Sequence, residues 1–398
     1  MPNVWTPIRN SEPNPRTAES CRASVHSPDR HGGGPTRPAF PISRVRVTDA
    51  PTARLRALAD TAARWRDPEY GPRSTAVDET LDAPNRWTEE ALAHVLNRRM
   101  QSITVEAVDD WLGSVPDEPA QTVAIRFGTA GPVDGMRMAL AAWARGHTTV
   151  GVCPEASPAL LPAFAEDLSE ALPSLDASFG DEAEALAAAD CLLARPDGPE
   201  DADALREACD HHGLSSAHRL LQGPVYSVGM VDGHETDDER ERLAEDMLLL
   251  DGTGRRRLAI LWAPEGLSPD AYLQSMAHFR GLYPAHPDTP GTLQMQQAFL
   301  EAQDQSHAYA EDLQFLVSRG EPARQKSAHV RWVEYTDREE VEAWLDEQGD
   351  DVAALIARRH LHDQVSPTSL LRTPGGVHVP PLDDPEGRAI VQFLSTAD

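Results

Sequence analysis

The sequence predicts an α/β protein built around parallel β-sheet. Between residues 122 and 231, short apolar segments typical of buried strands alternate with longer stretches of helical periodicity. Strands separated by helices favour a parallel sheet with right-handed crossover connections. A chain of 398 residues is also long enough for two packed domains. We therefore expect a two-domain α/β architecture.

The first 46 residues differ from the rest of the chain. They are rich in Pro, Ser, Arg and Gly and hold seven arginines against three acidic residues. Such a segment has little to bury, so residues 1–46 are predicted to be disordered. A helix is then expected over 50–67, followed by a proline-punctuated loop to Pro84. Thr88 is a natural N-cap for the next helix, because acidic residues follow it. A short helix over 105–112 completes this region.

The next segment alternates strands and helices. The predicted strands are 122–127, 148–154, 190–194 and 225–231, and the predicted helices are 133–145, 157–172 and 205–211. In parallel sheets the loop after a strand is where ligands bind. The loop after the first strand, Gly128-Thr129-Ala130-Gly131-Pro132, is therefore a candidate binding loop.

An apolar helix end at 248–250 runs into the turn Gly252-Thr253-Gly254, three arginines, and a buried strand over 258–264. Alternate glycines allow a sharp turn and close approach of another group. This arrangement is expected to present Arg255 at the mouth of a cleft. Two interpretations of Arg255-Arg256-Arg257 stay open. The arginines clamp phosphates of a ligand, or they neutralise neighbouring acids, namely Asp251, Asp246 and Glu245.

The C-terminal third continues the α/β pattern. Helices are expected over 268–279, 292–307 and 339–345, strands over 313–317, 329–335 and 352–357, and an apolar segment over 390–394 is expected to pack on the sheet.

Composition excludes several classes of function. The chain has 64 acidic and 36 basic residues, a net charge of -28, and a single lysine, Lys326. Dispersed acidic residues indicate adaptation to high internal salt, where self-repulsion is screened; the alternative is an acidic partner-binding surface. Binding to nucleic acid or anionic membrane is disfavoured. No apolar run reaches the roughly 20 residues of a membrane span. Without a signal-peptide pattern, a cytoplasmic protein is expected.

The cysteines do not form a metal-binding pattern. Cys21, Cys153, Cys191 and Cys209 show no C-x-x-C spacing, and the nearby His211-His212 pair is a weak signal, so no metal site is predicted. Cys153 and Cys191 lie in apolar surroundings, which raise the pKa of a thiol, so they are interpreted as buried small hydrophobic residues.

Several strings occur in an order that resembles one family. They are Asn85-Arg86-Trp87, Gly128 to Pro132, Arg145-Gly146-His147, Leu160-Leu161-Pro162, Leu249 to Pro264, and Pro374-Gly375-Gly376 to Phe393-Leu394. Over residues 85–394 the chain resembles the LuxC-type acyl-CoA reductases of the aldehyde dehydrogenase superfamily. The resemblance implies a two-lobed fold with a Rossmann-like parallel sheet. It places a cofactor-binding-like domain at 47–245 and a catalytic-type α/β domain at 246–398, with a C-terminal segment able to pack back on the first domain.

The family reaction implied by this resemblance is reduction of a long-chain acyl-CoA to an aldehyde with NADPH. A cysteine thiolate attacks the thioester, and hydride then reduces the bound acyl group. The resemblance places cofactor contacts on Thr129, Ala130, Gly131, Val152, Gly252 and Gly254. The superfamily also uses a glutamate near its cysteine, for which Glu265 and Glu334 are candidates.

This sequence departs from the family pattern at four positions of that site. The family cysteine falls on Arg255, whose guanidinium cannot attack a thioester. The oxyanion-binding asparagine falls on Ala130, and the lysine that contacts the cofactor ribose falls near Val152. A Gly-Ser pair falls on Arg195-Pro196-Asp197. The resemblance therefore indicates a retained scaffold without the family chemistry.

Three hypotheses follow. In the first, the chain is a non-catalytic, ligand-binding relative that binds NADPH or acyl-CoA, as a homo-oligomer or beside an active paralogue. In the second, it is an active reductase with a divergent nucleophile. In the third, it is an anion-binding α/β module outside this family that uses the arginine turn.

Overall fold

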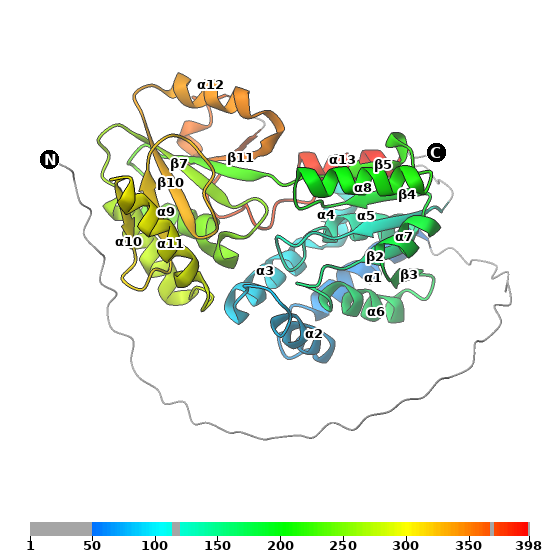
Figure 1. The fold of residues 1–398 in the computed structure, drawn as a ribbon. Helices are drawn as coiled ribbons and strands as arrows, with labels where there is room; N and C mark the ends of the chain where they lie inside the picture. Colours follow the sequence, from blue (N-terminus) through cyan, green and yellow to red (C-terminus); the bar gives the residue numbers. More distant parts are fainter. Residues whose placement is uncertain (1–49, 114–119, 367–369, 397–398) are drawn as a thin grey trace.

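The computed structural model describes residues 50–113, 120–366 and 370–396. The segment predicted to be disordered, 1–46, lies outside the described residues. Two sheets form separate lobes, one of five strands in the order β3-β2-β1-β4-β5 and one of seven in the order β12-β11-β6-β7-β10-β9-β8 (Figure 1). The predicted α/β class with two lobes is confirmed.

Four helices precede the first strand: α1 (Pro51–Arg64), α2 (Gly71–Leu81), α3 (Glu89–Ser102) and α4 (Val105–Leu112). The predicted cap is confirmed, because the Thr88 side chain accepts a hydrogen bond from the Ala91 amide. The prediction of a loop up to Pro84 was wrong, since α2 occupies most of it. Pro72 lies in the first turn of α2, where its missing N–H costs no helix hydrogen bond.

All neighbouring strands of the first sheet are parallel. Its strands are β1 (Thr122–Arg126), β2 (Thr148–Val152), β3 (Ala177–Phe179), β4 (Cys191–Ala194) and β5 (Arg219–Leu221), and its helices are α5 (Met136–Arg145), α6 (Leu160–Ala171), α7 (Glu182–Ala188) and α8 (Pro199–His211). Successive side chains of β1 point to opposite faces of the sheet and so pack in two different cores. Val123 and Ile125 pack in the core that includes α5 and α6, whereas Ala124 packs in the core that includes α7 and α8. The sequence analysis missed β3 and β5, which are only three residues long and not fully buried.

The second sheet is parallel except for the antiparallel pair β8–β9. Its strands are β6 (Tyr226–Met230), β7 (Leu258–Pro264), β8 (His307–Tyr309), β9 (Leu316–Arg319), β10 (His329–Tyr335), β11 (Val352–Ala357) and β12 (Leu371–Arg372). The remaining α-helices are α9 (Asp237–Leu248), α10 (Asp270–Leu282), α11 (Thr289–Ala302), α12 (Arg338–Gln348) and α13 (Pro385–Leu394). Short 3-10 helices are η1 (Ser216–His218), η2 (Leu249–Gly252), η3 (Gly349–Asp351) and η4 (Arg359–Leu361).

Strand pairing assigns β6 to the second lobe. β6 lies between β11 and β7, although the sequence analysis placed residues 225–231 in the first domain. We propose a division between β5 and β6 in place of the boundary at 245/246.

The last helix crosses back to the first lobe. α13 packs against α4 and α5 (Figure 1), with Ile390 and Leu394 buried. The prediction that 390–394 packs on the sheet was wrong, because α13 packs on the helices α4 and α5 instead. The chain therefore returns from the second lobe and brings residues 384–386 to the junction of the two.

Candidate functional site

The Gly-Thr-Gly turn is held in an unusual backbone conformation. After α9 ends, Leu250, Asp251 and Gly252 have φ angles of 54°, 56° and 63°, a left-handed conformation that costs a non-glycine residue roughly 1–2 kcal/mol. Asp251 offsets part of this cost through its side chain. One carboxylate oxygen lies 3.0 Å from Arg280 Nη2, and the other accepts hydrogen bonds from the His286 amide and the Thr289 hydroxyl.

The two glycines of the turn are required for close approach. A Cβ atom on Gly252 would lie 2.9 Å from the Ala328 backbone nitrogen, and one on Gly254 would lie 2.6 Å from His378 Nδ1. Both distances are shorter than a carbon can tolerate without movement of its neighbours. The interpretation of these glycines as sites of close approach is thus confirmed.

The arginines after the turn are largely shielded from solvent and point in different directions. Arg255 Nη1 lies 2.6 Å from Glu386 Oε1, and its Nη2 donates to the carbonyls of Gln222 and Gly223. Arg256 Nη2 lies 2.8 Å from Glu386 Oε2 and 2.5 Å from Asp384 Oδ2. Arg257 donates instead to two backbone carbonyls in the second lobe. Arg255 therefore lies at the junction of the lobes rather than open to solvent at the mouth of a cleft, since only 9% of its side chain is accessible.

The acids expected to neutralise these arginines have other partners. Asp251 pairs with Arg280. Glu245 pairs with Arg98 of α3 at 2.5 Å, and Asp246 accepts hydrogen bonds from the Gly375 and Val377 amides. The expectation of neutralisation by acids close in sequence was wrong, because the backbone turn directs Arg255 and Arg256 toward the C-terminal helix.

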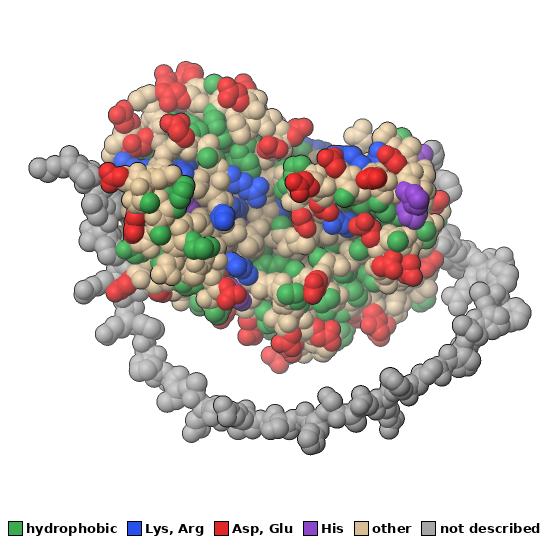
Figure 2. Space-filling view, viewed as in Figure 1, with side chains coloured by type: hydrophobic (Ala, Val, Ile, Leu, Met, Phe, Trp, Pro, Cys, Tyr) green, Lys and Arg blue, Asp and Glu red, His purple; other side chains and the backbone are tan. Residues whose placement is uncertain are grey.

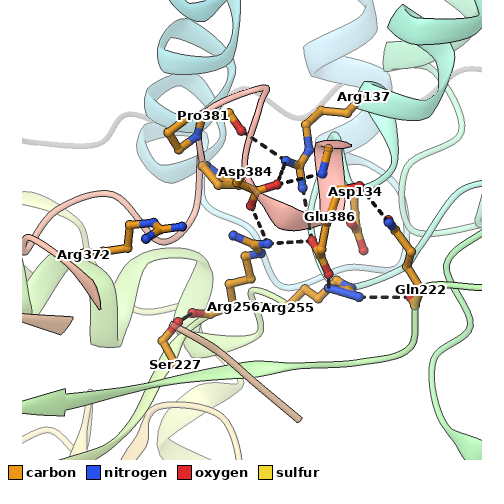
Figure 3. Close-up of polar contacts among 12 residues, drawn as sticks. Asp134, Arg137, Gln222, Ser227, Arg255, Arg256, Arg372, Pro381, Asp384 and Glu386 are labelled. Atoms are coloured by element: carbon orange, nitrogen blue, oxygen red, sulfur yellow. Dashed lines mark hydrogen bonds and ion pairs between the residues drawn. The ribbon is translucent and has the colours of Figure 1, made fainter. Parts of the chain in front are cut away.

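The carboxylates that do neutralise them come from the first turn of α13 (Figure 3). Asp384 caps this helix by accepting a hydrogen bond from the Gly387 amide. Its other contacts include Arg137 of α5, at 2.5 Å. Arg137 also lies 3.1 Å from Glu386, and Arg195 lies 3.3 Å from it. Glu386 thus joins arginines of the first lobe to arginines of the second.

This surrounding charge decides the ionisation of Glu386. Although burial opposes ionisation, the guanidinium groups of Arg195, Arg256 and Arg255 hold the pKa of the Glu386 carboxyl far below its ordinary value. Burial, and then the neighbouring Arg195, lower the pKa of Arg255 to about 9. At neutral pH both groups are charged.

A cavity of about 60 Å³ lies beside this network. Both lobes line it: Ala130, Gly131, Arg137 and Arg195 come from the first, Gly254, Arg255, Arg256, His378 and Glu386 from the second lobe and the C-terminal segment, and Arg99 from α3. Figure 2 shows basic side chains gathered along the hollow between the lobes, whereas acidic side chains dominate the outer surface in this view.

The structure brings together some of the predicted site residues and separates others. Ala130, Gly131, Gly254 and Arg255 line the cavity. The Thr129 hydroxyl donates to Asp197 at 2.7 Å. Two further predicted residues are not among those that line the cavity: Val152 at the end of β2, and Gly252, which packs against Ala328.

None of the described cysteines lines the cavity. Burial raises the pKa of the Cys153 and Cys191 thiols to about 12, so neither is a thiolate at neutral pH. The candidate bases are also elsewhere: Glu265 is exposed, and Glu334 pairs with Arg319 at 2.8 Å. Among the described residues, no group of three or more His, Cys, Asp or Glu side chains could hold a metal ion. Within the same ranges, no helix combines the length and apolar character needed to cross a bilayer.

Sequence reasoning missed Arg99, Arg137, Asp384 and Glu386. Arg137 interrupts the otherwise apolar start of α5, and Arg99 lies on the buried stripe of α3. An arginine on an apolar helix face indicates a buried partner or ligand. Asp384-Pro385-Glu386 also has the pattern of a helix start. These signals could have marked the four residues as candidates, although not their contacts.

Several solved structures that resemble this chain are aldehyde dehydrogenases. One is methylmalonate-semialdehyde dehydrogenase from Oceanimonas doudoroffii, with a TM-score of 0.62 and 13% identity over 84% of this chain and 80% of that one. Another is an aldehyde dehydrogenase from Pseudomonas aeruginosa, with a TM-score of 0.58 and 15% identity over 81% and 76%. A third, assigned as methylmalonate-semialdehyde dehydrogenase from Sinorhizobium meliloti 1021 and solved with NAD, has a TM-score of 0.61 and 12% identity over 83% and 78%.

These similarities show the fold. The chain has the two-lobed fold of the aldehyde dehydrogenases, as its sequence resemblance implied. No protein-family model matches the sequence, and a comparison of the sequence with curated proteins found no match.

Proposed function

We propose that this protein is a non-catalytic relative of the LuxC-type acyl-CoA reductases, in which an ion-paired arginine replaces the nucleophile. The observation that carries the proposal is Arg255. The resemblance places the family cysteine at this position, on the turn between α9 and β7. Here its guanidinium lies 2.6 Å from Glu386 and lines the cavity between the lobes. A guanidinium offers only donors and cannot form an acyl-enzyme.

The size of the cavity supports this proposal. Pockets that enclose small molecules or cofactors typically measure about 300–1,000 Å³, whereas this cavity measures about 60 Å³. The side chains of Arg255, Arg256 and Glu386 occupy part of the junction between the lobes. An acyl thioester and a nicotinamide ring would both have to displace them.

The residues at the carboxyl ends of β1, β2 and β4 do not fit a dinucleotide. Val152 offers no polar group for a ribose hydroxyl. The Thr129 hydroxyl is bound to Asp197, whose amide in turn donates to Asp201 at 2.8 Å. Arg126 pairs with Asp201 at 2.8 Å, so the Asp197 carboxylate is the negative charge that would repel a pyrophosphate at this edge. These residues therefore form no suitable bed for NADPH, and the retained function of the protein lies in binding or in association with another chain.

The test is a reductase assay on the full-length protein in high salt. NADPH oxidation at 340 nm is followed with long-chain acyl-CoA, and thiol alkylation is followed at neutral pH. We expect no acyl-CoA-dependent oxidation, and no cysteine that reacts faster than a model thiol. Turnover that disappears in Cys153→Ser or Cys191→Ser would establish an active reductase with a divergent nucleophile and refute the proposal.

A further inference from the structure

We propose that the cavity between the lobes binds a tetrahedral oxyanion, either inorganic phosphate or the phosphate of a monoester, with Arg99 as its principal ligand. This inference rests on the proposed function, because it treats the cavity as a binding site in a non-catalytic chain. It adds the class of ligand and the residue that recognises it.

The charged side chains around the cavity do not balance. Five guanidinium groups line the cavity: Arg99, Arg137, Arg195, Arg255 and Arg256. The carboxylates within ion-pair distance of these arginines at the cavity are three, Asp134, Asp384 and Glu386. The five arginines and three carboxylates among the described residues therefore carry a net charge of +2. Buried charge without a counterion is costly, so a bound anion would stabilise this arrangement.

Arg99 is the arginine of the cavity wall that lacks a carboxylate partner among the described residues. Its residue is only 5% exposed, and no carboxylate of the described residues lies within ion-pair distance of it. Its Nη1 has two long contacts, at 3.5 Å, with Ser102 Oγ and the Pro380 carbonyl. Its Nε has no hydrogen-bond partner. Arg99 is therefore a buried cation with unused donors in the wall of the cavity.

The cavity suits an oxyanion in both size and chemistry. A single water needs about 10–15 Å³ of such space, so a cavity of about 60 Å³ accommodates a few waters or one phosphate-sized ion. The planar fork of a guanidinium matches the oxygens of phosphate. The N-terminus of α5 also forms part of the wall, at Met136 and Arg137, and its dipole favours an anion.

The test is thermal unfolding of the full-length protein with increasing potassium phosphate, with KCl holding the ionic strength constant. A ligand that binds only the folded state raises Tm by mass action. Phenyl phosphate forms a parallel arm. A larger shift with it than with phosphate indicates a site that takes monoesters, and a shift with phosphate alone indicates a closed site for the free ion; both support the proposal.

Arg99→Gln is the decisive variant, and Arg206→Gln is its control, because Arg206 lies on the exposed face of α8 and loses the same charge. We expect Arg99→Gln to need at least about tenfold more phosphate for the same shift, while Arg206→Gln matches the wild type. Without phosphate, Arg99→Gln should unfold no earlier than the wild type, because a buried unpaired charge has been removed. If Arg99→Gln does not fold, Arg99→Lys is titrated calorimetrically, and weaker phosphate binding is expected because the fork is lost.

The absence of a phosphate-dependent shift in the wild type, or an equal shift in the Arg99 variant, would overturn the inference. The assay contains neither acyl-CoA nor NADPH, so its failure is distinct from that of the proposed function. Reductase turnover refutes the non-catalytic assignment whatever phosphate does, and a silent phosphate titration without turnover refutes only the oxyanion site.

Discussion

Replacing Glu386 with glutamine should destabilise the protein because this carboxylate joins the two lobes. Arginine Nη atoms of Arg255, Arg256, Arg137 and Arg195 lie 2.6, 2.8, 3.1 and 3.3 Å from its oxygens. Glutamine keeps the shape of the side chain but removes its negative charge, so the four guanidinium groups lose the carboxylate that offsets their mutual repulsion. Removing one partner from a buried ion pair costs roughly 3–5 kcal/mol. Because 17% of the Glu386 side chain remains accessible to water, we expect the lower end, about 3 kcal/mol.

The pH dependence of this effect follows from the lowered pKa of Glu386. A carboxyl whose folded pKa lies below its unfolded value of about 4.3 contributes its full stabilisation above that value. The contribution is lost as the pH falls toward the folded pKa. The difference in stability between wild type and Glu386→Gln should therefore be constant near neutral pH and shrink below about pH 4.

The assay is urea denaturation at pH 7 and pH 3.5, followed by both tryptophan fluorescence and circular dichroism. Urea is preferred because guanidinium chloride screens ion pairs. Glu166→Gln, on the exposed face of α6, is the matched control and should behave as wild type. A Glu386→Gln protein as stable as the control at pH 7 would refute the reasoning, and an unchanged difference at pH 3.5 would refute the assignment of the effect to charge.

Three further predictions concern the turn, the first lobe and the whole chain. Gly252→Ala should cost roughly 2–4 kcal/mol, from the left-handed backbone and the overlap with Ala328. Gly281→Ala, in open space on α10, should instead stabilise the protein by about 0.5–1 kcal/mol. If both variants shifted the urea unfolding midpoint in the same direction relative to the wild type, this account would be contradicted. Thr88→Ala removes the cap of α3 and should lower the unfolding free energy by about 1 kcal/mol. An unchanged free energy of unfolding in urea denaturation would mean that the cap is dispensable. Raising KCl from 0.1 to 2 M should increase Tm, because the net charge of -28 is then screened, and a flat or falling Tm would argue against adaptation to salt.

Much of the fold could be predicted because its signals are local. β10 occupies the predicted range 329–335, and β7 begins and ends at the predicted residues 258 and 264. Such strands are rich in apolar and aromatic residues, so the residue types of the strand themselves indicate that it is buried. α2 was missed because its sequence begins with Gly-Pro, holds few apolar residues and carries little helical periodicity. Its formation depends on packing against α6 and α3, which no local pattern shows.

The sequence by itself determined the α/β class, the two glycines of the turn, the placement of Arg255 on that turn and the excess of acidic charge. Only the tertiary structure decided what Arg255 does. Its partner, Glu386, is 131 residues away in the chain, and nearer acids were plausible partners on sequence alone. Ion pairs depend on distance in space, and the left-handed turn after α9 and the return of α13 to the first lobe set that distance. For the same reason the unpaired charge of Arg99 becomes visible only when both lobes and the last helix are in place.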